Sequence, residues 1–220
     1  MDVWRYSDWD GYKDDLRGSQ RHIWRWRDWI VESLNANKPY DRMIVEMLAA
    51  HDIAPEDRDA LRATGFLARN FHASNRNIWL DAVVEHTAKG FLGLTLNCAR
   101  CHDHKYDPID QHEYYAFRAI FEPHRVRTER VPGQPDLKLD GLPRAYDADL
   151  AAATYVFLQG DDKRPDKERP MPPATPALFD LPLEIEEVHL PPIAGFPALA
   201  EFTEREELAA AAGQVQQRRA

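Results

Sequence analysis

NCARCHDHKYDP, residues 97–108, holds both cysteines of the chain and two of its nine histidines. Within it, Cys98, Cys101 and His102 have the CxxCH spacing of c-type haem attachment. Two thiols about one helical turn apart can both reach the vinyl groups of one porphyrin edge, and the next residue is then held under the iron. The spacing predicts haem c as cofactor, Cys98 and Cys101 as its anchors, and His102 as the iron ligand.

The same residues leave other interpretations open. Cys98, Cys101, His102 and His104 are four zinc ligands within seven residues, although adjacent Cys101 and His102 cannot easily turn to one tetrahedral centre. The cysteines could also form a local disulfide or a plain thiol pair. A thioredoxin-like redox pair is disfavoured, because that motif follows a strand, whereas here a predicted helix precedes it. The run from His102 to Asp107 is also typical of hydrolase metal sites, but it lacks their further histidine.

A second axial ligand to a haem iron is not fixed by the motif, and five-coordinate iron is equally compatible with it. His104 is too close to His102 to reach the opposite face of the ring. We take His86 as the distal ligand to test first, because it lies three residues after Val83, near an apolar stripe. The other histidines and methionines that qualify are His72, His112, His124, Met43, Met47 and Met171. Met43 and Met47 lie on apolar stripes and are expected in the core.

The part before residue 122 is predicted to be helical. Apolar residues recur at three- and four-residue spacing over 20–35 (Ile23, Trp26, Ile30 and Leu34), and again over 40–50 and 77–96. A short helical turn is expected after Pro55, and a further helix over 110–121. Trp24, Trp26 and Trp29 are expected to pack in the core and at its edge.

The part beyond residue 122 holds 13 of the 16 prolines. Residues 154–159 predict a strand that Gly160 ends, and 183–190 a second short strand. Residues 161–176 are expected to be extended and solvated. A capping box at Thr203 predicts a helix over 203–220. The fold class is therefore mainly α, with a Pro-rich extension carrying one or two short strands and a C-terminal helix. The predicted domains are 1–125, 126–202 and 203–220.

Composition excludes several classes of protein. Apolar residues make up 44% and charged residues 30% of 220, which is typical of a globular protein. The formal net charge is −9 and neither part of the chain is basic, so we expect no nucleic-acid partner. No apolar run is long enough for a membrane span. The N-terminal residues show neither the basic nor the apolar region of a signal peptide.

Three stretches carry a resemblance to a known family. Residues 65–70, GFLARN, and 91–95, FLGLT, which leads into the CxxCH run up to Ile109, resemble the domain of unknown function found in planctomycete cytochrome c-like proteins. The resemblance covers residues 1 to about 125, and 154–173 resembles the start of the family's next domain, also of unknown function. It implies Cys98, Cys101 and His102 as the haem-type motif and supplies no role for His104, Lys105 or Asp107.

The resemblance also implies a context. Relatives are large exported proteins with a signal peptide, so the chain is expected to be a truncated fragment lacking flanking domains, periplasmic or otherwise exported in the full-length protein. The expected function is a c-type haem module for electron transfer or redox sensing, with an unidentified redox partner. The alternative is a structural or binding module, for instance a carbohydrate-related one, in which the Cys/His cluster holds zinc or a disulfide. Whether the chain is an enzyme is left open.

Overall fold

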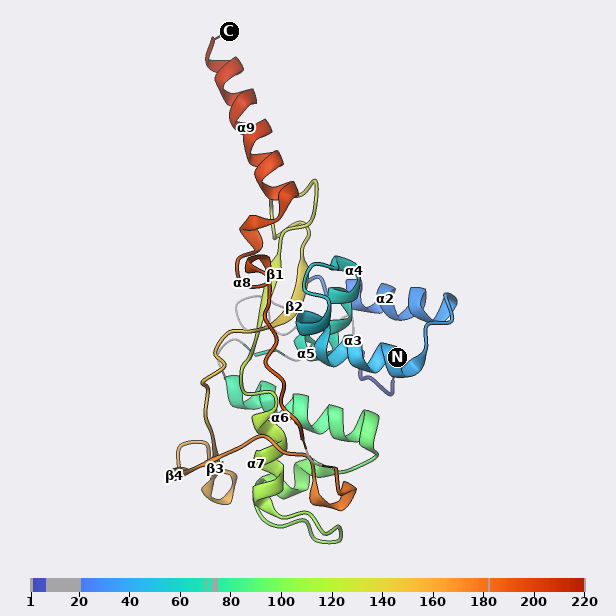
Figure 1. The fold of residues 1–220 in the computed structure, drawn as a ribbon, viewed down its shortest axis with the longest axis vertical. Helices are drawn as coiled ribbons and strands as arrows, with labels where there is room; N and C mark the ends of the chain where they lie inside the picture. The colour runs from blue at the N-terminus through green and yellow to red at the C-terminus, as the bar shows by residue number, and fades with distance from the viewer. Residues whose placement is uncertain (1, 7–20, 70, 73–74, 182, 220) are drawn as a thin grey trace. The chain divides into compact units, whose positions relative to one another are not determined.

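The computed structural model describes residues 2–6, 21–69, 71–72, 75–181 and 183–219 (Figure 1). The chain forms two compact units, each made of segments that are far apart in the sequence. Unit 1 contains Arg69–Arg125 and Asp147–Glu187 with the described N-terminal residues, and unit 2 contains Ser19–Ala68, Val126–Tyr146 and Val188–Ala220. Gln20 and Ala220, where we expected the first and last helices to begin and end, lie outside the described residues.

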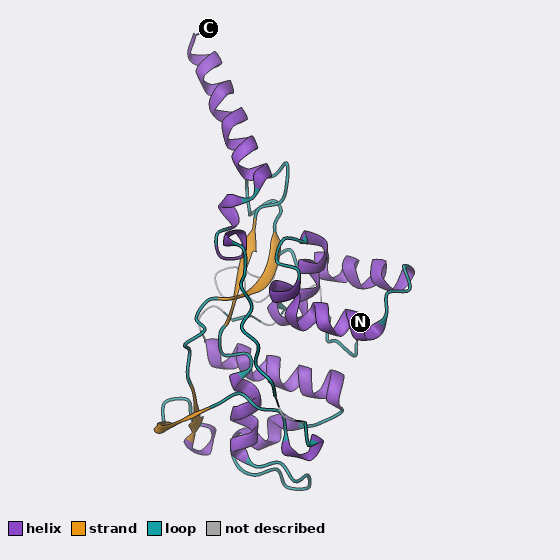
Figure 2. Cartoon of the chain, viewed as in Figure 1, coloured by secondary structure: helices purple, strands orange, loops and turns teal. Residues whose placement is uncertain are grey.

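Helices dominate both units, which confirms the mainly α fold class (Figure 2). Two pairs of strands accompany them. Strand β1 (His124–Glu129) pairs with β2 (Leu142–Asp147), and β3 (Thr154–Phe157) pairs antiparallel with β4 (Pro165–Met171). In the described part of the chain, every helix is too short or too polar to cross a membrane.

Unit 2 is built on helices that follow the predicted stripes. Its helices are α2 (Trp24–Asn35), α3 (Tyr40–Ile53), α4 (Arg58–Leu61), α5 (Gly65–Ala68), α8 (Pro192–Gly195) and α9 (Glu201–Arg219). Trp26, Trp29 and Met47 are buried and Trp24 lies at the edge, as predicted. Leu34 was expected in the core but is 62% exposed, because the last turn of α2 packs through Ser33, which is buried, and Leu34 next to it faces away.

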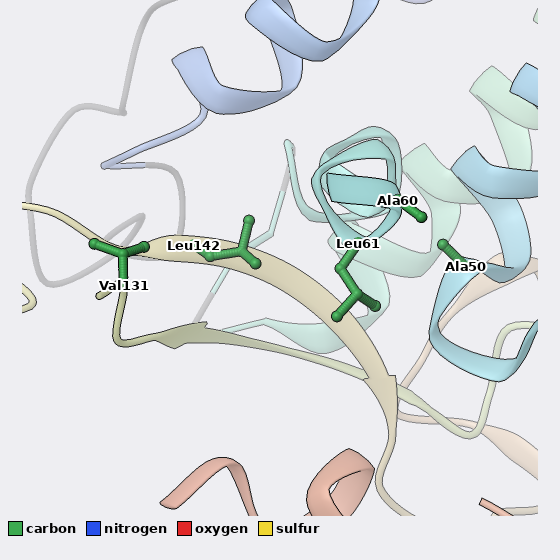
Figure 3. Close-up of a cluster of buried hydrophobic side chains, with 5 residues drawn as sticks. All are labelled: Ala50, Ala60, Leu61, Val131 and Leu142. Atoms are coloured by element: carbon green, nitrogen blue, oxygen red, sulfur yellow. The ribbon is translucent and has the colours of Figure 1, made fainter. Parts of the chain in front are cut away.

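The β1–β2 hairpin contributes apolar side chains to the core of unit 2. Figure 3 shows Ala60 and Leu61 of α4 and Ala50 of α3 grouped with Val131 and Leu142 from the hairpin. All five residues are buried. The hairpin, which the sequence did not predict, therefore closes the helical core on one side.

Unit 1 is built around α6 (Arg76–Thr87) and α7 (Gln111–Ala119) (Figure 1). Asn75 caps α6, and Asp110 with Glu113 forms a capping box on α7. The predicted helix over 77–96 ends early, because a π-helical turn follows α6 and Gly93 then adopts φ +70°, a left-handed conformation that terminates it.

Three expectations for the C-terminal half need correction. The segment 161–176 is only partly exposed, and β4 within it pairs with the predicted strand β3. Residues 183–190 form no strand and are exposed. Neither of the described strand pairs, β1–β2 and β3–β4, takes up this segment. Thr203 is buried inside α9 rather than capping it, since its N–H donates to the Ala200 carbonyl one residue before the helix begins.

Candidate functional site

The CxxCH segment lies in unit 1, between α6 and α7. Leu96–Arg100 forms a 3₁₀ turn that ends at Cys101. Cys98 lies within this turn and Cys101 is the residue that follows it. Both cysteines are free and exposed. All three residues of the motif, Cys98, Cys101 and His102, are therefore exposed.

Buried neighbours hold the backbone between the two cysteines. Ala99 and Leu96 are fully buried. The Arg100 carbonyl accepts hydrogen bonds from Gln111 Nε2 at 2.9 Å and from Tyr115 Oη at 3.1 Å, both from α7. The Arg100 side chain is paired with Asp81 of α6 at 3.0 Å. The motif is therefore anchored to both helices while its reactive groups face outward.

Asp81 is the centre of a polar network that sequence reasoning missed. Its carboxylate accepts a hydrogen bond from Tyr114 Oη at 2.7 Å and lies 3.4 Å from the guanidinium of buried Arg118. Arg118 also donates to Asn77 Oδ1 at 2.6 Å. Burial raises the pKa of Asp81, although Tyr114 and the arginines act in the opposite direction. Burial and the Asp81 carboxylate raise the pKa of Tyr114 well above its usual value.

His102 is exposed, and one hydrogen bond fixes its tautomer. Its Nδ1 lies 2.7 Å from the Asp103 carbonyl oxygen. A carbonyl only accepts, so Nδ1 is the donor, and in the neutral ring Nε2 keeps its lone pair. A metal-bound histidine has the same arrangement, in which one nitrogen donates to a carbonyl and the other binds the metal.

His104, by contrast, uses both ring nitrogens within its own loop. Nδ1 accepts the N–H groups of Asp107 at 2.8 Å and Tyr106 at 3.3 Å, and Nε2 lies 3.1 Å from Thr95 Oγ1. The Asp107 carboxylate lies 3.4 Å from Nδ1. It makes no hydrogen bond to Nδ1, because this nitrogen accepts hydrogen bonds and so carries no proton to donate. The side chain is only 6% exposed. His104 thus closes the loop after the motif.

Replacing His104 with alanine should loosen this loop. We expect amide exchange of Tyr106 and Asp107 to accelerate about tenfold, corresponding to the loss of about 1–2 kcal/mol of local stability. Hydrogen–deuterium exchange followed by NMR measures the exchange rates of these two amides. Exposed His112 is the matched control, and His112→Ala should leave both amides unchanged. Equal exchange in the His104→Ala variant and the wild type would show that the ring does not hold the loop.

A zinc cluster is not preformed around the motif. Among the described residues, Cys98, Cys101, His102 and His104 do not supply three ligand atoms within 4.8 Å of one another. Zinc binding there would need the loop to rearrange and His104 to give up its hydrogen bonds.

His86, the predicted distal ligand, is half-buried on α6. Desolvation lowers its pKa to about 4, and Arg69, Arg5 and Lys89 act in the same direction while Glu85 opposes them. The ring is therefore neutral at physiological pH, as a metal ligand must be. Its buried Nδ1 has no hydrogen-bond partner in the described part of the chain. Its role as distal ligand stays a prediction.

Comparison with known proteins gives one match. The model of a family described as PSCyt2, protein of unknown function (DUF1549), matches residues 1–126. No curated protein and no solved structure matches the chain.

Proposed function

Starting from the membership of this chain in the PSCyt2 family of proteins of unknown function, we propose that its CxxCH segment attaches haem covalently and that unit 1 is a c-type haem module. The single observation that carries the proposal is the His102 ring. In this exposed ring the Nδ1 proton is engaged by the Asp103 carbonyl, so Nε2 of the neutral ring keeps its lone pair for a metal.

The thiols support the same function. Cys98 and Cys101 are unpaired with each other and exposed, one within a 3₁₀ turn and the other directly after it. In attachment each thiol adds across one vinyl group: the sulfur bonds to the inner carbon and the hydrogen goes to the outer one, so no oxidant is needed. The residues present therefore fit haem, with two anchors and one ligand.

When bound, haem supplies a one-electron redox couple, which suits electron transfer or redox sensing. The chain's own part is to hold the His102 ring and both thiols. The network of Asp81, Arg100 and Tyr115 fixes the backbone that carries them. The proposal also requires export of the protein, because bacterial haem attachment to this motif takes place outside the cytoplasm.

The test is expression with export to a periplasm that contains the cytochrome c maturation proteins. We expect a pyridine haemochrome signal that survives denaturation and extraction in the wild type. Cys98→Ala should shift the signal by the loss of one thioether, and Cys98→Ala/Cys101→Ala should lose covalent haem. His112→Ala, outside the motif, is the control and should retain full haem.

Zinc is measured on the same samples. A chain without haem that carries about one zinc would overturn the proposal in favour of a structural Cys/His site. A chain that carries neither would overturn it as well. Covalent haem that is unchanged in the double cysteine variant would show that attachment does not use this motif.

A further inference from the structure

A turn from the second half of the sequence lies directly against the CxxCH motif. Gly160, at the end of the 3₁₀ turn Leu158–Gly160, is buried and has φ +75°. A Cβ atom at this position would overlap the Cys101 sulfur and lie 3.3 Å from the Cys101 Cβ. Only glycine fits both the backbone conformation and the space that the sulfur leaves. This turn lies outside the residues matched by the family model.

Contacts on both sides fix the turn in place. Gln111 Nε2 donates to the carbonyls of Arg100, inside the motif, and Phe157, just before the turn, at 2.9 and 3.1 Å. The Phe157 ring packs edge-on against Tyr115 at 5.3 Å and under the Arg118 guanidinium at 4.9 Å.

The far side of the turn is held as well. Asn77 of α6 donates to the Asp162 carboxylate at 3.1 Å. The first residue of the turn, Leu158, donates its N–H to the carbonyl of Arg164, which lies just beyond the turn, at 3.0 Å. Residues on both sides of the turn are thus hydrogen-bonded to the two helices that flank the motif, and we call residues 158–160 the strap.

We propose that this strap positions the Cys101 thiol and makes the two cysteines chemically unequal. Gly160 covers one side of the Cys101 sulfur, while the residue keeps exposed surface elsewhere. Cys98 is then the more accessible thiol, and Cys101 is held in one orientation. The step to haem rests on the proposed function: a pre-positioned Cys101 would direct one vinyl group to a single thiol.

The test uses the protein without haem, so that it is independent of attachment. Timed alkylation with iodoacetamide and peptide mass spectrometry gives the rates at Cys98 and Cys101. In the folded wild type we expect Cys101 to react about three- to tenfold more slowly than Cys98, and the two rates to converge in urea. Equal rates in the folded protein would overturn the proposal.

The variant Gly160→Ala tests whether Gly160 is what slows the reaction of Cys101. The new methyl group forces either the sulfur or the strap to move, and both responses uncover Cys101, so its rate relative to Cys98 should rise about three- to tenfold. Gly133→Ala is the matched control, because Gly133 has φ +82° but nothing within 4 Å of an added Cβ. It carries the same backbone strain and should leave the ratio unchanged.

If Gly160→Ala fails to fold, Gln111→Ala loosens the strap without filling space and should raise the Cys101 rate by a smaller factor. A ratio that neither variant changes in folded protein would overturn the proposal. Haem attachment tested separately on Gly160→Ala should yield a mixture of vinyl–thiol pairings, because Cys101 is no longer held in one orientation. If the alkylation results hold but no haem attaches to the wild type, the strap stands and the proposed function fails.

Discussion

Replacing Glu129 with glutamine should lower the free energy of unfolding of unit 2 by about 3–5 kcal/mol, the range for removing one partner of a buried ion pair. The Glu129 side chain is 6% exposed and lies near three guanidinium groups. The distances are 2.7 Å to Arg127, 3.3 Å to Arg144 and 3.9 Å to Arg58. Glutamine keeps the shape of the side chain and removes the charge that all three arginines share.

The arginines stay charged when the Glu129 carboxylate is removed. Burial lowers the pKa of Arg144 to about 10, with Arg127 and Arg58 acting in the same direction, and Glu129 opposes the shift. Arg144 therefore stays charged at neutral pH. Arg127 donates to the carbonyls of Ala194 and Gly195, which satisfy hydrogen bonds but carry no net charge. A second change, Arg144→Met, should recover part of the lost stability, because it removes a buried charge.

Urea unfolding followed by tryptophan fluorescence measures the effect. Glu207 supplies the control, since it pairs with Arg130 at 3.3 Å but is 69% exposed. Glu207→Gln should cost less than about 0.5 kcal/mol. A Glu129→Gln variant as stable as Glu207→Gln would mean that the buried cluster contributes no more than a surface pair.

Local patterns account for what the sequence predicts correctly. The stripe of Trp26 and Ile30 predicts α2, and alternating β-branched and aromatic residues predict β3. The partner of β3 escapes prediction, because β4 reads PDKERPM, a charged, Pro-containing run that looks solvated, and nothing local encodes the pairing. The same holds for β1 and β2, which become a hairpin only where helices offer an apolar surface.

The residues of the candidate site also fall into those that the sequence predicts and those that it does not. Cys98, Cys101 and His102 stand together in the sequence, so their spacing predicts them. Asp81 lies 33 residues from Tyr114 and 37 from Arg118, and neither helix pattern marks the three as partners. Gly160 is a still clearer case. As a sequence feature it only ends a strand, and its contact with Cys101 comes from the way β3 packs on α7.

Gly65→Ala should destabilise unit 2 by about 2–3 kcal/mol, as expected for overpacking a core. An added Cβ would overlap the Cβ of Trp26 and lie 2.7 Å from its Cγ. Trp26 cannot move aside, because it is 1% exposed and packs edge-on against Phe66 at 5.9 Å. Backbone strain does not contribute, since Gly65 has helical φ −51° and alanine is the better helix former. The loss is therefore due to the close approach of α5 to α2, and the higher helix propensity of alanine offsets only part of it.

Gly213→Ala is the matched control for this substitution. Gly213 is also helical, in α9, but nothing lies within 4 Å of an added Cβ. Alanine there should stabilise the helix by about 0.5–1 kcal/mol. The two substitutions are chemically identical and are expected to have opposite signs in urea unfolding. If Gly65→Ala instead stabilised the protein as Gly213→Ala does, the close contact between Gly65 and Trp26 would have to be abandoned, and with it the packing of α5 against α2.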